Sequence, residues 1–192
     1  VLFNSIAGAS STNTITIQGQ NVDACIIEYN TSGTNSYVIQ LNGTDYVRLR
    51  DLTINATGTT YGYGVWLRNG ANRNEITDCK INVSPTSTSS YAIGILASNN
   101  YYYYAGDAAN YTLIEGNEVS GGYYGIRMNG NSYSNTCDGN EILDNDVTGW
   151  YYYGIYMYYQ GTYTVQGNTI HMRAGNDYGY GYYDYYGHNG FE

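Results

Sequence analysis

The chain has little of what builds helices or nucleic-acid-binding surfaces. Its 192 residues include one proline, three cysteines and seven basic residues, and Lys80 is its single lysine. No stretch shows the 3.6-residue apolar period of a helix longer than a turn or two. Seven basic residues against a net charge of −9 cannot supply the positive stripe that nucleic-acid binding requires. We therefore expect an all-β protein that does not bind nucleic acid.

Membrane and metal signatures are scarce as well. The sequence has no apolar run of membrane-spanning length and no signal peptide, so we expect no membrane insertion. Cys25, Cys79 and Cys137 are 54 and 58 residues apart, which fits no zinc motif. His171 and His188 are the only histidines, and they are too few for a copper site. We interpret the cysteines as structural filler and expect that the protein requires no cofactor.

What the sequence does contain is a repeat. Five stretches share an apolar residue, two variable positions, a fourth position that is mostly small or an amide, a variable position and a β-branched residue. They are residues 49–54, 76–81, 114–119, 142–147 and 165–170. A second short strand follows each stretch, and its matching glycines are 30, 31, 29 and 27 residues apart: Gly64, Gly94, Gly125, Gly154 and Gly181. Such a period is typical of a solenoid, in which each unit buries its apolar face against its neighbours.

The type of strand identifies the solenoid. Apolar residues alternate over short runs, as at Ile126 and Met128, and Asn-Gly pairs such as Asn129-Gly130 mark turns. We predict one domain over residues 1–192, a right-handed parallel β-helix of about six coils with 27–31 residues per coil and little or no helix. Stacking the coils places the fourth motif positions in one column, which predicts an asparagine ladder rather than surface amides in polar turns: Leu52, Cys79, Asn117, Asn145 and Asn168.

Residues 74–81 (NEITDCKI), 140–147 (NEILDNDV) and 121–132 (GGYYGIRMNGNS) carry a likeness to known proteins. The chain resembles the parallel β-helix repeat family, a pectate-lyase-like superfamily that includes polysaccharide lyases and many secreted repeat proteins. Residues 3–58 resemble the β-helix segments of very large bacterial surface or secreted proteins. This resemblance implies an extracellular or cell-surface location. Because neither end reads as a polar cap, we expect either a fragment of a longer chain or a unit that stacks end to end.

Tyrosine is the most unusual component, with 27 residues against two phenylalanines and two tryptophans. By register, one column of the second strand should face outward and form an aromatic stripe: Trp66, Leu96, Arg127, Tyr156 and Tyr183. We predict Trp66, Arg127, Tyr156 and Tyr183 as ligand-binding residues that contact polysaccharide or a cell-surface glycan. The alternative is that the tyrosines only stiffen the sheet through their β propensity and stacking. Residues 99–110 lengthen their coil, and we expect them to form a protruding loop.

A catalytic alternative comes from the resemblance, because lyases of this fold pair carboxylate-bound Ca²⁺ with an Arg or Lys base. The candidate residues are Lys80, Glu118, Asp146 and Arg127, and Ca²⁺ would then be the cofactor. Alternating charges in an outward column are, however, also what a solvated ladder needs.

We therefore expect a non-catalytic segment of an extracellular or cell-surface protein, with a tyrosine-rich surface for structure, adhesion and glycan contact. One alternative is a polysaccharide lyase or glycoside hydrolase domain. The other is a filament subunit that associates with itself through the ends of the solenoid.

Overall fold

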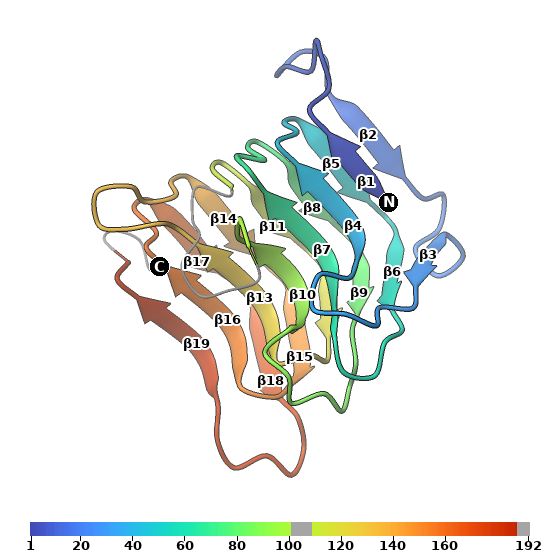
Figure 1. The fold of residues 1–192 in the computed structure, drawn as a ribbon, viewed down its shortest axis with the longest axis vertical. Coiled ribbons are helices and arrows are strands. Elements are labelled where there is room, and N and C mark those ends of the chain that lie inside the picture. The colour runs from blue at the N-terminus through green and yellow to red at the C-terminus, as the bar shows by residue number, and fades with distance from the viewer. Residues whose placement is uncertain (101–108, 188–192) are drawn as a thin grey trace.

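The computed structural model describes residues 1–100 and 109–187, and within them it contains nineteen β-strands and no helix. The strands form three parallel sheets (Figure 1). Sheet A contains β1 (Leu2–Asn4), β4 (Tyr37–Asn42), β7 (Gly62–Arg68), β10 (Ala92–Ala97), β13 (Tyr124–Asn129), β16 (Tyr153–Tyr158) and β19 (Tyr180–Tyr185). Sheet B contains β2 (Ile15–Gln18), β5 (Val47–Arg50), β8 (Glu75–Thr77), β11 (Leu113–Glu115), β14 (Asn140–Leu143) and β17 (Tyr163–Gln166). Sheet C contains β3 (Ile26–Tyr29), β6 (Thr53–Ala56), β9 (Lys80–Asn82), β12 (Glu118–Ser120), β15 (Asp146–Trp150) and β18 (Thr169–Met172).

The chain visits the three sheets in turn, so each strand pairs with the third strand before it and the third after it. The result is a parallel β-solenoid of about six turns, as the sequence predicts, and Figure 1 shows its coils side by side from the N-terminal to the C-terminal end. The expected protruding loop at 99–110 lies mostly outside the described residues.

The core consists of apolar columns that run through the coils. Ile76, Ile114 and Ile142 are register partners in sheet B, and all three are fully buried. Sheet C contributes a second column that includes Ile81, Val119 and Val147, and sheet A faces both sheets with branched and sulfur-containing side chains. Residues about thirty positions apart are therefore neighbours across the rungs, which is the premise on which every column prediction depends.

The repeated motif is a corner between sheets B and C. Its first residue is the second-to-last residue of a sheet B strand, and its last residue lies in sheet C, as Ile142 in β14 and Val147 in β15 illustrate. The third motif position has a left-handed backbone in every repeat, with φ of 52° at Asp51, 54° at Asp78 and 52° at Asp144. Aspartate tolerates this conformation better than most residues. The aspartate column is therefore explained by the turn itself.

The predicted asparagine ladder lies inside this corner. Asn117 Nδ2 donates to Asn145 Oδ1 at 2.9 Å, and Asn145 Nδ2 donates to Asn168 Oδ1 at 2.9 Å. The same oxygens accept from the backbone N–H of the preceding member, and Cys79 N–H caps the series by donating to Asn117 Oδ1 at 3.0 Å. Each ladder amide also donates to a sheet B carbonyl, such as Ile114 O at 2.9 Å. The ladder thus satisfies buried backbone groups that the turn leaves without partners.

The three cysteines, all within the described part of the chain, form no disulfide. Cys79 occupies the ladder column, where its Sγ donates to Thr77 O at 3.3 Å. Burial raises the pKa of the Cys79 thiol to about 11, so the thiol stays protonated and unreactive at neutral pH. This agrees with its interpretation as a small structural residue.

The two ends of the solenoid differ in polarity. At the N-terminal end the inward positions are apolar, with Phe3, Ile17 and Ile27 only partly covered. In β19 the column that holds Met128 and Met157 continues with Asp184, which accepts a hydrogen bond from the Tyr163 hydroxyl. An inward-pointing charge on a sheet edge discourages further strand pairing.

Candidate binding surface

The predicted aromatic column exists in the expected register. In sheet A, Trp66 pairs with Leu96, Leu96 with Arg127, Arg127 with Tyr156, and Tyr156 with Tyr183. These side chains all belong to the outer face of sheet A, because the positions on either side of each in its strand face the core. The strand alternation that the sequence shows therefore places them correctly.

The exposure of this column differs from the expectation, which we correct here. Trp66 is only 2% exposed, Arg127 3% and Tyr156 8%, so most of the column does not face solvent. The rings of Tyr37 and Tyr63 pack edge-on against Trp66, with centroids at 5.9 and 5.1 Å. The columns on either side of the predicted one also carry large side chains, and these close over it. The predicted stripe is consequently the buried base of a cluster of large side chains on the outer face of sheet A. We call this cluster the aromatic layer; its buried rings are those of Tyr63, Trp66, Tyr124, Tyr156 and Tyr158.

Arg127 is a structural part of this layer. Its guanidinium carbon lies 4.7 Å from the ring centroid of Tyr124 and 5.4 Å from that of Tyr156, and its Nε donates to Asn129 Oδ1 at 3.2 Å. Cation–π contacts and a hydrogen bond compensate a charge that would otherwise be costly to bury. The guanidinium is therefore held between rings, away from the surface.

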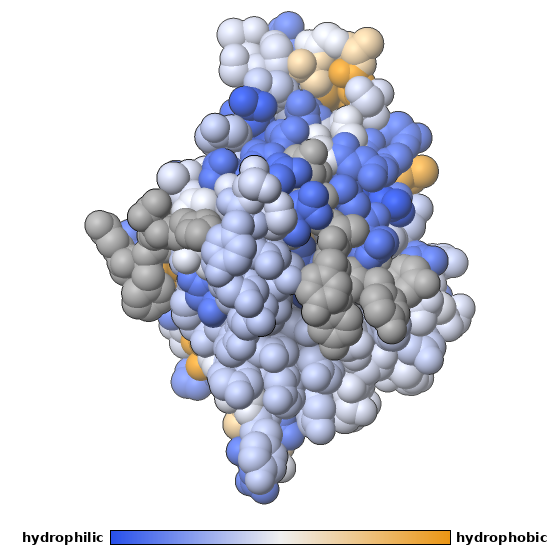
Figure 2. Space-filling model, turned by 60° about the vertical axis from the view of Figure 1, so that its left-hand side comes forward, coloured by the Kyte–Doolittle hydropathy of each residue, from blue (hydrophilic) through white to orange (hydrophobic). Residues whose placement is uncertain are grey.

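Tyrosines of successive coils stack on one another in four rows. The stacked pairs have centroid distances of 5.0–5.5 Å and interplanar angles of 4–16°: Tyr124–Tyr153, Tyr153–Tyr180, Tyr156–Tyr183, Tyr158–Tyr185 and Tyr159–Tyr186. We call these the tyrosine rows. Because each ring covers the face of the next, the side of the solenoid presents ring edges and hydroxyls. Figure 2, which brings the left-hand side of Figure 1 forward, accordingly shows a broad face of intermediate hydropathy.

The tyrosine rows end at β19, the outermost strand of sheet A in the part of the chain that the structure describes. Tyr180 and Tyr186 are 46% and 39% exposed, and Tyr183 is half-buried. Here the rings have a face that no further described coil covers. Of the four predicted ligand-binding residues, Tyr183 alone thus reaches an accessible position. Tyr180 and Tyr186 belong to the same tyrosine-rich segment as Tyr183 but lie outside the predicted column.

Alkaline pH should unfold the protein. Burial raises the pKa of Tyr153 in the aromatic layer and of Tyr163 in the core, where the Tyr163 hydroxyl also donates to Asp184. The folded state therefore binds these phenolic protons more tightly than the unfolded state, whose tyrosines titrate near pH ~10. The stabilisation is complete below about pH 10 and is lost as pH rises from there through the folded-state pKa. We expect the absorbance of tyrosinate to rise over the same pH range in which the β-sheet circular dichroism signal is lost.

The variant Tyr153→Phe should move that alkaline transition to higher pH, because it removes a proton that unfolding releases. Tyr29→Phe, which alters an exposed tyrosine on sheet C, should leave it unchanged. Full ionisation of all tyrosines with an intact circular dichroism spectrum would contradict this account.

The charged column of the catalytic alternative lies on sheet C. Lys80 pairs in register with Glu118, and Glu118 with Asp146. Lys80 Nζ lies 2.6 Å from Asp23 Oδ1 and 3.8 Å from Glu118 Oε2, in an exposed setting. The hydrogen bond that Lys80 donates to Asp23, with the charges of Asp23 and Glu118, raises the pKa of Lys80, which favours its protonated form. A residue in this state is poorly suited to act as a base.

Arg127 does not join these three residues, since it is buried in the outer layer of sheet A. The structure therefore assembles Lys80, Glu118 and Asp146 but leaves out the fourth member of the candidate catalytic group. Within residues 1–100 and 109–187, no three His, Cys, Asp or Glu side chains come together as a metal site.

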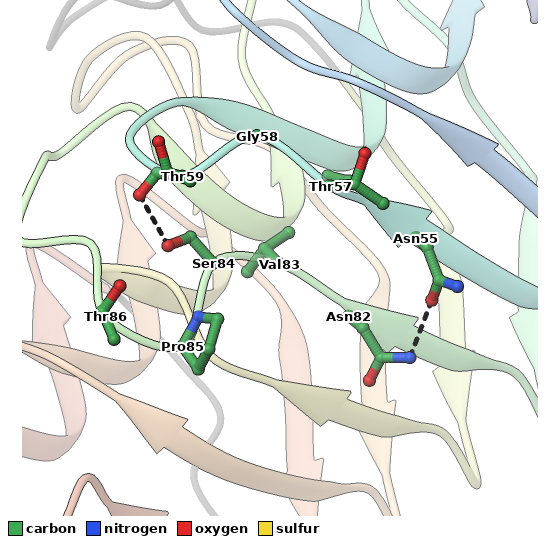
Figure 3. A pocket seen from close by; sticks show the side chains of 10 residues that line it. Asn55, Thr57, Gly58, Thr59, Asn82, Val83, Ser84, Pro85 and Thr86 are labelled. Atoms are coloured by element: carbon green, nitrogen blue, oxygen red, sulfur yellow. Dashed lines mark hydrogen bonds between the residues drawn. The ribbon is translucent and has the colours of Figure 1, made fainter.

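A shallow groove of about 390 Å³ runs past the ends of β6 and β9 (Figure 3). At one end Asn82 Nδ2 donates to Asn55 Oδ1 at 2.9 Å, and at the other Ser84 Oγ donates to Thr59 O at 2.7 Å. The two amides are thus paired with each other, and the Ser84 hydroxyl is paired with a backbone carbonyl. The groove contains no charged residue and no aromatic ring, so it offers less to a ligand than the tyrosine rows do.

Comparisons with known proteins add no relative: no family model matches the chain, and neither the curated proteins nor the solved structures contain a match. The part of the chain that the structure describes has no helix that is long and apolar enough to cross a membrane.

Proposed function

We propose that the chain is a non-catalytic β-solenoid segment of an extracellular or cell-surface protein, and that its tyrosine rows serve adhesion and glycan contact. The observation that carries this proposal is the group of tyrosines at β19, where Tyr180, Tyr183 and Tyr186 combine an accessible ring with a hydroxyl. Tyrosine suits a surface that is apolar on one side and wet on the other, and it is enriched in binding sites for this reason.

A sugar ring places its C–H groups on an aromatic face and its hydroxyls beside other polar groups. Tyr180, Tyr183 and Tyr186, which we call the row ends, fit this chemistry, because their ring faces lie beside phenolic hydroxyls on a rigid parallel sheet. Sites on rigid strands lose little conformational entropy when they bind. The proposed ligand is therefore a neutral or weakly charged glycan, since an acidic one would be repelled by a chain with net charge −9.

The sequence resemblance to the pectate-lyase-like superfamily also brings a polysaccharide lyase or glycosidase into consideration. The buried position of Arg127 and the protonated state that Asp23 favours at Lys80 support the non-catalytic proposal instead. In an end-to-end filament, Asp184 of one copy would have to meet the column of Phe3 in the next. Burying a carboxylate against an apolar ring is costly, which also makes this alternative less favourable.

We expect immobilised neutral glycans to retain the protein, and the double variant Tyr180→Ala/Tyr183→Ala to weaken that binding about tenfold or more, as loss of aromatic anchors does at interfaces. The matched control is Tyr29→Ala, which removes an exposed tyrosine from sheet C. Binding would be measured on a glycan array and by calorimetry, with circular dichroism to check the fold.

The same preparation would be incubated with acidic and neutral polysaccharides, and absorbance of unsaturated sugars and release of reducing ends would be followed. Turnover would overturn the non-catalytic proposal. Equal binding by the double variant and the wild type would remove the row ends as the contact site.

A further inference from the structure

Five tyrosines from three coils form a compact cluster at one corner of sheet A. Tyr186 stacks on Tyr159 with centroids 5.0 Å apart, and it meets Tyr185 at 4.1 Å and Tyr133 at 4.8 Å. Tyr133 also contacts Tyr159 at 5.3 Å, and Tyr158 lies against Tyr159 at 4.4 Å. We call this group the ring cluster. Tyr133 is 56% exposed and Tyr186 39% exposed, so the two rings are in mutual contact and are also accessible to a reagent in solvent.

The backbone at two members of the ring cluster is strained. Tyr159 and Tyr186 have φ of 48° and 64°, a left-handed conformation that bulky side chains rarely adopt. Both directly follow a sheet A strand, β16 and β19. At the equivalent place after β4 and β7, the chain has Gly43 and Asn69, with φ of 61° and 55°, and these are the residue types that suit such a turn. The last two coils therefore hold a ring where the backbone favours glycine or asparagine.

Strain of this kind points to a role for the side chain, because packing alone would be served by any position that the backbone tolerates. At Tyr186 the result is a phenol in direct contact with the phenol of Tyr133, which belongs to the turn after β13 and is 53 residues away in the sequence. A hydrogen bond of 3.2 Å between the hydroxyls of Tyr185 and Tyr186 keeps the reactive oxygen of Tyr186 at the surface of the cluster.

We propose that the ring cluster is a site of oxidative tyrosine coupling, in which Tyr133 and Tyr186 are joined by a carbon–carbon bond when a peroxidase and hydrogen peroxide act on the protein. Each phenol gives up one electron and one proton and becomes a phenoxyl radical. The two radicals combine at ring carbons ortho to the oxygens, and each of those carbons then loses its hydrogen as a proton while each oxygen regains one. Two electrons and two protons leave in total, and they reduce one hydrogen peroxide to two waters.

Two features favour this pair. The rings are already in contact, so coupling is intramolecular and proceeds at a high effective concentration. Both rings are also accessible, whereas Tyr156 and Tyr158 are buried and Tyr153 packs against them in the aromatic layer. The bond would tie the turn after β13 to the end of β19, and so fasten the last coil that the structure describes, whose sheet A strand has no fully buried residue.

Trypsin places Tyr133 and Tyr186 in different peptides, so a bond between them can be detected by mass spectrometry. It cuts after Arg127 and after Arg173, so Tyr133 falls in fragment 128–173 and Tyr186 in fragment 174–192. The full chain would be treated at low protein concentration with horseradish peroxidase and hydrogen peroxide, and then digested. We expect a joined fragment whose mass is the sum of the two less two hydrogens, with dityrosine fluorescence and with monomeric protein on a denaturing gel.

The variants Tyr133→Phe and Tyr186→Phe keep the rings but remove the phenols, and each should lower the yield of the joined fragment by about tenfold or more. The control Tyr178→Phe alters the most exposed tyrosine, at 79%, and should leave the yield unchanged. Wild-type protein unfolded in urea should also lose the joined fragment, which tests the dependence on the fold without any substitution. The proposal is overturned if coupling is confined to fragment 174–192, if it links separate molecules, or if it persists in Tyr133→Phe.

Discussion

Asn145→Ala should lower the free energy of unfolding by about 3–5 kcal/mol, because it leaves several buried polar groups without partners at once. Asn145 Oδ1 accepts from both the backbone N–H and the Nδ2 of Asn117, and its own Nδ2 donates to Ile114 O and to Asn168 Oδ1. Alanine removes all four of these bonds at a position that is 1% exposed, where water cannot replace them.

The isosteric variant Asn145→Asp refines this test. It keeps the oxygen that accepts from Asn117 but replaces the donor with a second oxygen that faces Ile114 O and Asn168 Oδ1. We expect strong destabilisation at neutral pH and partial recovery on acidification, since a protonated carboxyl can donate once again. The matched control is Asn55→Ala, which breaks an amide pair that is only partly buried and should cost less than about 1 kcal/mol. Equal losses at both sites would show that the ladder gains nothing from burial.

Gly125→Ala should be the second severe substitution, with a loss of about 3 kcal/mol, at the upper end of what overpacking costs. An added Cβ would lie 2.3 Å from Val147 Cγ1 and 2.7 Å from the Gly154 carbonyl oxygen. The first obstacle is a side chain that could shift, but the second is backbone of the next coil, which is fixed by the β-sheet. Chemical denaturation of the variant, followed by circular dichroism, measures this loss.

The double variant Gly125→Ala/Val147→Ala separates the two obstacles, because it removes only the side chain. We expect it to recover part of the loss caused by the glycine substitution, so that the two changes are not additive. Gly33→Ala is the control: its Cβ would meet one atom, Ser36 Oγ, at an ordinary 3.6 Å, and its effect should be small. A full recovery in the double variant would mean that the backbone contact does not matter.

The fold could be predicted because its signals repeat. Ile76, Ile114 and Ile142 appear at the same motif position, and stacking the motifs reproduces their register in sheet B. The ladder of Asn117, Asn145 and Asn168 follows from the same alignment. In a repeat, the register of one pair of coils also gives the register of the other pairs, so the sequence was sufficient to predict which residues stack in the core.

The surface was harder to predict, since strand alternation says which face a residue occupies but not what covers that face. Trp66 and Arg127 are on the predicted side of sheet A, yet neighbouring rings bury them. The exposure of a residue depends on the rotamers of large side chains in the neighbouring columns, and the repeat period of the sequence does not determine those rotamers. The left-handed backbone of Tyr159 and Tyr186 was similarly hidden, because tyrosine gives no turn signal.

The asparagine ladder has one more consequence. Asn145, an inner member of the ladder, accepts two hydrogen bonds from the asparagine of one neighbouring coil and donates two to the asparagine of the other. An inner coil therefore presents the same hydrogen-bonding groups to both of its neighbours. Ile114 and Ile142 are 28 residues apart, and a duplicate of that stretch could be spliced in between them with every amide finding an identical partner on either side. Such a chain can lengthen or shorten by whole modules over evolutionary time while its interior chemistry stays the same.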